Sequence, residues 1–110
     1  MEQVAEDIQD YWNEYIGFAM LLRSSGFDKV KRLIRESPVQ TYTERFLPEI
    51  YGGLMDDVNK NKIQRLDRVA RYVNKGASTA ALTESDFKRA VNLAHHIIYG
   101  KTRPRPYEKV

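Results

Sequence analysis

Cysteine is absent from this chain of 110 residues, which excludes disulfide bonds and thiolate metal sites and favours a reducing, cytoplasmic compartment. The longest apolar run, from Ile16 to Leu22, is far shorter than the roughly 20 residues that a membrane-spanning helix needs. The first residues, from Met1 to Asp7, carry no basic side chain and do not resemble a secretory signal. These absences predict a cytoplasmic protein that does not bind membranes.

Side chains suited to catalysis or metal binding are scarce. The two histidines, His95 and His96, are neighbours about 100° apart around a helix, so both rings do not easily reach one metal ion. We expect one to line the edge of the core and the other to be exposed. The Asp-Asp pair at 56–57 is interpreted as solvated surface, and the Gly-Gly pair at 52–53 lacks the Lys-Ser/Thr that follows a phosphate-binding loop. The sequence therefore predicts no catalytic residues, metal or cofactor, and a protein that is not an enzyme.

Helical periodicity runs through most of the chain, and no β-hairpin signal occurs. The pattern predicts an all-α fold, a compact bundle of four to five helices, formed by residues 1–100 as a single domain. Residues 101–110 contain two prolines in X-Pro-X-Pro order, which predicts an extended and flexible basic tail.

The expected helix boundaries follow from caps and prolines. A helix is predicted over residues 3–24 with Gly26 as its cap, and a short one over 27–36, ended by Ser37-Pro38. Residues 41–58 contain a capping box, Pro48 and two glycines. The glycines indicate either a hinge or close backbone approach, or a break between two short helices.

The second half contains two further expected helices. The first covers residues 60–75, with Gly76 as its cap and a small-residue connector over 77–82. The second begins at the capping box of Thr83 and ends near Tyr99, before Gly100. The predicted core consists of the apolar stripes of these helices: Ile8, Trp12, Tyr15, Ala19, Leu33, Ile34, Leu54, Leu66, Val69, Val73, Phe87, Val91, Ala94 and Ile98.

One segment of the first helix is apolar nearly all round. Around Met20 and Leu21 the sequence reads F-A-M-L-L, which indicates burial on more than one side. We expect this segment to lie at the centre of the bundle. The alternative is that Met20 and Leu21 form an exposed ridge that faces a partner.

Charge is distributed unevenly along the chain. The net charge of the protein is +3, but residues 1–22 contain five acidic residues and no base. Residues 60–75 contain six bases and one acid, and the tail from Lys101 adds three more net positive charges. Such asymmetry predicts one surface for a polyanion and another for a basic neighbour, which could be a second copy of the chain.

The helix over 60–75 is the basis of the functional hypothesis. Its apolar side carries Leu66 and Val69, and its opposite side carries Arg68, Arg71 and Lys75. This cationic row is either an ordinary solvated face or a binding surface for the phosphates of RNA or DNA, without sequence specificity. The aromatic residues available for stacking outside the core are Tyr72, Tyr99 and Tyr107. The predicted nucleic-acid contacts are Arg65, Arg68, Arg71, Lys75, Lys88, Arg89, Lys101, Arg103 and Arg105.

The second hypothesis is a helical adaptor or regulatory protein that binds other proteins. Its contacts would come from the acidic first helix and the apolar ridge. The predicted protein-interaction residues are Glu6, Asp10, Glu14, Met20 and Leu21.

The last part of the chain resembles a known group of proteins. The basic helix, the small-residue connector and the final D-F-K-R-A-V-N-L-A-H-H-I-I-Y-G are similar to the small all-helical subunits of CRISPR effector complexes. The resemblance covers about the last 50 residues and depends on size, helicity, basicity and helix order, not on a signature motif. It implies a subunit of an antiviral ribonucleoprotein that contacts the guide-RNA backbone through the basic residues already named.

Overall fold

In a computed structural model of the chain, residues 2–37, 57–100 and 106–107 are described. They form four helices and no strand: α1 (Glu2–Ser25), α2 (Phe27–Glu36), α4 (Asp57–Ser78) and α5 (Glu84–Tyr99). The fold is therefore an all-α bundle, as predicted. The expectations for residues 38–56, including the capping box, Pro48 and the glycine pair, lie outside the described residues, as does the core prediction for Leu54.

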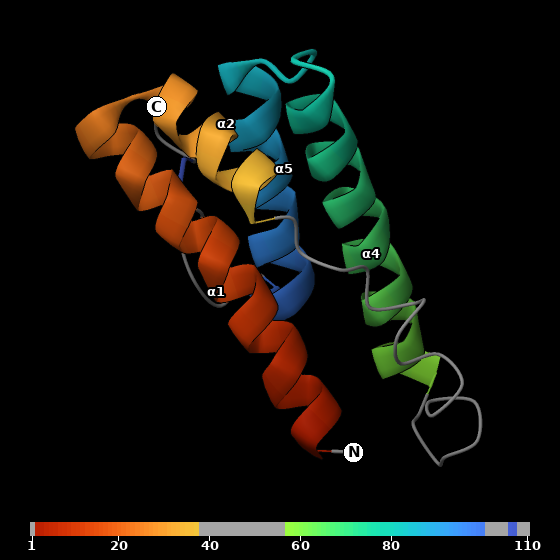
Figure 1. Cartoon of the computed structure of the whole chain (residues 1–110). Helices are drawn as coiled ribbons and strands as arrows, with labels where there is room; N and C mark the ends of the chain where they lie inside the picture. The colour runs from red at the N-terminus through yellow and green to blue at the C-terminus, as the bar shows by residue number, and fades with distance from the viewer. Residues whose placement is uncertain (1, 38–56, 101–105, 108–110) are drawn as a thin grey trace.

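The helices are arranged so that α5 contacts both α1 and α4, while α2 contacts α1 and α4 (Figure 1). The connector between α4 and α5 is short, and the two helices run antiparallel side by side. This antiparallel packing places the outer sides of α4 and α5 on one surface.

The core forms where the apolar stripes of the four helices meet. Trp12 and Tyr15 of α1, Val73 of α4 and Phe87 of α5 are at most 1% exposed. Leu33 and Ile98 are only half-buried, although Ile98 packs against the core. The side chain of Ile8 lies outside the described residues. Ten of the predicted core positions are confirmed as buried: Trp12, Tyr15, Ala19, Ile34, Leu66, Val69, Val73, Phe87, Val91 and Ala94.

The boundary between α1 and α2 agrees with the sequence. Gly26 has φ of 93°, a left-handed conformation that favours glycine, and its N–H donates to the carbonyl of Leu22. At the end of α2, the N–H of Ser37 donates to the carbonyl of Leu33 over 2.9 Å. The single glycine thus turns the chain back so that Val30 and Ile34 of α2 reach the core.

The predicted end of α4 at Gly76 is wrong, because the helix continues to Ser78. Gly76 lies within the helix and against Leu82, whose Cβ would stand 2.9 Å from a Cβ added at the glycine. Ala77, which was expected in the connector, is completely buried. The chain turns after Ser78 instead, where Ala80 has φ of 61°. Gly76 therefore provides room for the connector to pack and is not a cap.

The start of α5 is capped as predicted. The Oγ1 of Thr83 accepts a hydrogen bond from the N–H of Asp86 over 3.1 Å. The helix ends at Gly100, which has φ of 62° and donates its N–H to the carbonyl of His96. His95 is buried with its ring 4.6 Å from that of Tyr99, while His96 is half-buried, so only the first part of the histidine prediction is confirmed.

Met20 was expected near the centre of the bundle, but its side chain is 59% exposed. Leu21, by contrast, is half-buried and packs against the core. Helices α2 and α5 cover one side of α1, and Met20 lies on a side of α1 that no described helix covers. The expected burial is therefore wrong for Met20, and the alternative of an exposed ridge is reduced to this one exposed side chain.

Candidate nucleic-acid interface

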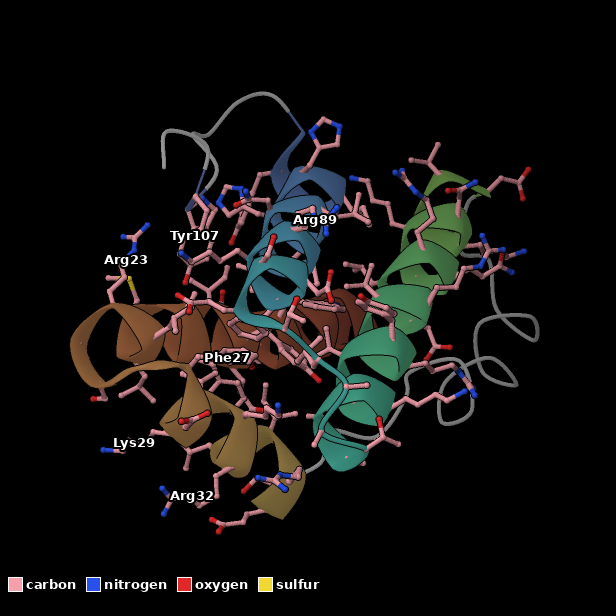
Figure 2. All side chains as sticks on the ribbon, turned by 90° about the horizontal axis from the view of Figure 1, so that it is seen from above. Arg23, Phe27, Lys29, Arg32, Arg89 and Tyr107 are labelled. Carbon is pink, nitrogen blue, oxygen red and sulfur yellow. The ribbon has the colours of Figure 1, made fainter. Side chains whose placement is uncertain are left out.

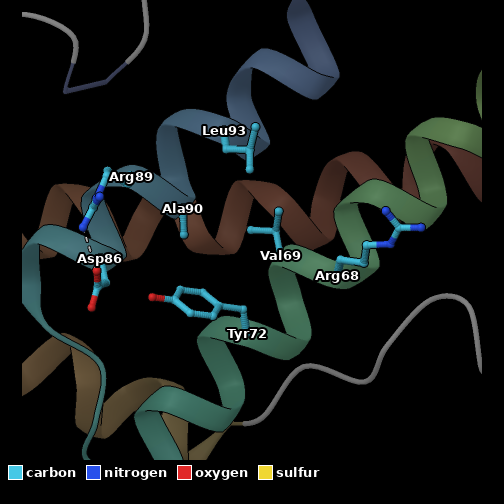
Figure 3. A pocket seen from close by; sticks show the side chains of 7 residues that line it. All are labelled: Arg68, Val69, Tyr72, Asp86, Arg89, Ala90 and Leu93. Carbon is cyan, nitrogen blue, oxygen red and sulfur yellow. Dashed lines mark hydrogen bonds and ion pairs between the residues drawn. The ribbon is translucent and has the colours of Figure 1, made fainter.

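An open groove lies on the outer surface where α4 and α5 meet. Its volume is about 430 Å³, and it lies between the antiparallel helices (Figure 3). The residues that line it come from both helices: Arg68, Val69, Tyr72, Asp86, Arg89, Ala90 and Leu93. The floor is formed by small and aliphatic side chains, and charged groups lie at its ends.

Helix periodicity explains why α4 places an aromatic ring beside cations. Arg68 and Tyr72 are four residues apart, so they lie one turn apart on the same side of the helix. At about 100° per residue, Arg65 and Lys75 fall on neighbouring lines of that side. The ring of Tyr72 is half exposed and extends along the groove, between Arg68 and the Asp86–Arg89 pair (Figure 3).

The cations of α4 differ in how they are held. Arg65, Arg68 and Lys75 are exposed, and in the described part of the chain none of them forms an ion pair. Arg71 is different: its Nε donates to Oδ2 of Asp67 over 2.7 Å, and the Asp67 side chain is buried. Arg71 therefore neutralises a buried carboxylate and cannot be treated as a free member of the row.

The cations of α5 are both held by acids of the same helix. Nη2 of Arg89 lies 2.9 Å from Oδ1 of Asp86, and Nζ of Lys88 lies 3.3 Å from Oε1 of Glu84. Arg89 reaches the groove, but Lys88 does not line it. Nζ of Lys88 instead lies 5.5 Å from the ring centre of Tyr107. Lys88, a predicted nucleic-acid contact, therefore lies outside the groove.

The carboxyl of Asp86 stays ionised at the end of the groove. Its side-chain hydrogen bond with Thr83 is the largest influence that lowers its pKa, followed by the backbone of Thr83 and by Arg89, and together they outweigh desolvation. The groove thus offers two guanidinium groups and one carboxylate, with a net positive charge.

Tyr107 was expected to be available for stacking but is buried. Its hydroxyl donates to the carbonyl of Ala19 over 2.8 Å, and its N–H donates to Oδ1 of Asn92 over 2.9 Å. Arg23 lies 5.0 Å from its ring centre and donates to the carbonyl of Pro106. Burial raises the pKa of Tyr107 above its usual value of 10.0. Tyr107 anchors this part of the chain between α1 and α5 (Figure 2).

Tyr99 is half-buried and packs its ring against that of His95 in a tilted arrangement, which leaves Tyr72 as the most exposed of the three tyrosines proposed for stacking. The sequence signal for Tyr72 is its spacing of four residues from Arg68, which places it on the outer side of α4. Its position beside the groove depends on the packing of α5 against α4. Asp86 and Leu93, which the sequence did not indicate as site residues, join it for the same reason.

Several predicted site residues lie away from the groove or outside the described residues. Asp10 and Glu14 are exposed on α1, as predicted, whereas the side chain of Glu6 lies outside the described residues. The tail cations Lys101, Arg103 and Arg105 lie outside them as well. The expected mobility of the tail remains a prediction for residues 101–105 and 108–110.

No group of three or more His, Cys, Asp or Glu side chains that could hold a metal ion occurs among the described residues. Within the same ranges, none of the helices has the length and apolar character needed to cross a membrane. No known protein family, curated protein or solved structure matches the chain.

Proposed function

We propose that this protein is a non-enzymatic helical module that binds the backbone of RNA or DNA across the outer surface of α4 and α5. The observation that supports this proposal is a set of exposed cations on α4 that form no ion pair with any other described residue: Arg65, Arg68 and Lys75. Arginine and lysine at such positions bind phosphates by charge, with no dependence on base sequence.

The position of these cations favours binding over simple solvation. At 1.5 Å rise per residue, the row from Arg65 to Lys75 extends for about 15 Å along a rigid helix. That length is comparable with several phosphate steps of a nucleic acid. Tyr72 and Arg89 border the same surface, so that the cations are grouped around a concave feature and do not stand alone.

The resemblance to small helical subunits of CRISPR effector complexes gives this module a wider context. Under the proposal, the protein is one subunit of a larger ribonucleoprotein and aligns along its nucleic acid. Isolation of the untagged protein from its native cells, followed by sequencing of bound nucleic acid and identification of bound proteins, tests this part. Copurification with proteins alone would favour the adaptor function, in which the exposed Met20 of α1 is a contact.

The binding itself is tested by fluorescence anisotropy with a labelled RNA oligonucleotide over a series of salt concentrations. A variant with Arg65, Arg68 and Lys75 changed to glutamine should bind more weakly. The slope of log K against log salt should become shallower by about two units if each residue neutralises one phosphate.

Helix α2 provides a matched control. Its outer side carries Lys29, Arg32 and Arg35, which are also exposed, and Figure 2 shows Lys29 and Arg32 directed away from the bundle. Changing these three to glutamine alters the net charge by the same amount. If both triple variants lose affinity equally, the protein attracts nucleic acid only through its overall charge, and the proposed surface is rejected.

A further inference from the structure

We propose that the groove between α4 and α5 is a stacking site for an unpaired base, so that the ligand of this surface is a single-stranded nucleic acid. This inference rests on the proposed function and adds the class of nucleic acid to it. The first observation is the exposure of Tyr72, whose side chain is 52% accessible although the ring borders an apolar groove. An aromatic ring in that position offers a face on which a base of any identity can stack.

The groove has dimensions and walls that suit such a ligand. Its volume of about 430 Å³ falls within the range of about 300–1,000 Å³ typical of small-molecule sites. Val69 and Ala90 form an apolar floor, and Leu93, which is 46% exposed, adds a further apolar surface. A planar base would cover these side chains and remove them from water.

Charge decides between a nucleotide and a hydrophobic helix of another protein as the occupant. Arg68 lies at one end of the groove and does not form an ion pair within the described residues, so its guanidinium can donate hydrogen bonds to a phosphate. At the other end, Arg89 is paired with Asp86, which gives both donors and acceptors for a sugar or a base edge. An apolar helix would offer no partner to the Arg68 guanidinium and would partly desolvate the Asp86–Arg89 pair.

The same features distinguish single strands from duplexes. Bases in a duplex are stacked on each other and paired, so they do not present a face to Tyr72 unless the duplex opens. A single strand can place one base in the groove while its flanking phosphates reach Arg68 and the neighbouring Arg65. Cationic residues beside an exposed aromatic ring are the usual combination for single-strand binding.

The test compares three labelled probes of equal length: a single-stranded RNA, the same RNA as a duplex, and a strand of abasic units with the same number of phosphates. The single strand should bind more tightly than the other two. Tyr72→Ala should weaken binding of the single strand by about 5- to 100-fold, and it should leave binding of the abasic strand unchanged.

Tyr72→Phe is the matched variant, because it keeps the ring and removes only the hydroxyl, and it should bind as the parent does. Circular dichroism confirms that both variants are folded. Equal binding of the abasic and intact strands, or full affinity of Tyr72→Ala for the intact strand, would overturn the stacking site while the backbone-binding function stands. If none of the three probes binds at low salt, both proposals fail. If Tyr72→Ala instead abolishes self-association in sedimentation experiments without affecting RNA, the groove is a protein interface.

Discussion

Helices α4 and α5 are both basic on their outer sides, yet their cations are in different states. On α4, Arg65, Arg68 and Lys75 have no acid three or four residues before them, and they are exposed without ion pairs among the described residues. On α5, Glu84 and Asp86 precede Lys88 and Arg89 by four and three residues and hold them. The number of basic residues on a helix thus overestimates the positive charge available to a ligand. Acidic residues three or four positions away must be counted as well, because they pair with some of the bases.

Arg71 shows that the same distinction applies within one helix. It belongs to the cationic row by sequence, but its partner Asp67 is 5% exposed. Replacing Arg71 together with Arg68 and Lys75 would therefore disturb folding as well as binding. The test variant therefore changes Arg65, Arg68 and Lys75 and leaves Arg71 in place, so that binding is altered without disturbing the buried Asp67.

The largest expected effect concerns the apolar inner side of α4. Its burial fixes the orientation of the helix and thereby keeps the cationic side exposed. Leu66 is 2% exposed, and Leu66→Ala should lower the free energy of unfolding by about 2–5 kcal/mol through lost burial and a cavity. Chemical denaturation measures this change. A cost below about 0.5 kcal/mol would mean that α4 is oriented differently, and the grouping of its cations would be lost.

The second prediction concerns Gly76, which provides room for Leu82 to pack against α4. Gly76→Ala should destabilise the protein by about 1–3 kcal/mol, because the new Cβ would be 2.9 Å from that of Leu82. Gly17 of α1 is the control, since nothing lies within 4 Å of a Cβ there. Gly17→Ala should stabilise by about 0.5–1 kcal/mol. Thermal melts of both variants provide the comparison, and equal stabilisation would show that Leu82 does not pack closely against Gly76.

The third prediction separates the held and unheld arginines of α4. Arg71→Gln should cost about 1–2 kcal/mol, because it leaves the buried Asp67 carboxylate without this partner. Arg68→Gln should change stability by less than about 0.5 kcal/mol and should weaken nucleic-acid binding instead. Urea unfolding of the two single variants measures the difference. If Arg68→Gln destabilises as much as Arg71→Gln, the ion pair with Asp67 does not make Arg71 more important for stability than Arg68.

The fourth prediction concerns Tyr107, whose ring centre lies 5.5 Å from Nζ of Lys88. Tyr107→Phe should cost about 0.5–1.5 kcal/mol through loss of the hydrogen bond to Ala19. Because burial raises the pKa of Tyr107, its contribution is complete below pH 10.0 and falls as the pH rises through the folded-state pKa. Stability measured across this range should decline less in Tyr107→Phe than in the parent. An identical decline in both would assign it to other groups.

The smallest expected effect concerns Asp86, which holds Arg89. Its pKa is lowered in the folded protein, so its contribution to stability is present above its unfolded pKa of about 3.9 and is lost as the pH falls through the folded value. Asp86→Asn should therefore reduce the loss of stability in acid. At neutral pH the same variant releases Arg89, and the salt slope of RNA binding should steepen by up to about one unit. An unchanged slope would show that Arg89 does not reach the ligand.

Much of the local structure could be predicted from the sequence because its causes are local. The periodic apolar residues of α1, α2 and α5, the left-handed turn at Gly26 and the cap at Thr83 all depend on residues within about four positions of one another. The ion pairs of Lys88 and Arg89 have the same range.

The rest was decided by contacts between residues distant in the chain. Tyr15 donates to Asn74 across 59 positions, and Tyr107 donates to Ala19 across 88. Gly76 is a site of close packing against Leu82 and not a cap. Local sequence signals do not show which side chain from another part of the chain packs against a helix. The groove exists only because α5 packs antiparallel to α4 and brings Asp86, Arg89 and Leu93 opposite Tyr72. The sequence by itself therefore determined the helices and their charges, whereas tertiary packing decided which tyrosine is exposed, which cations remain available and where they meet.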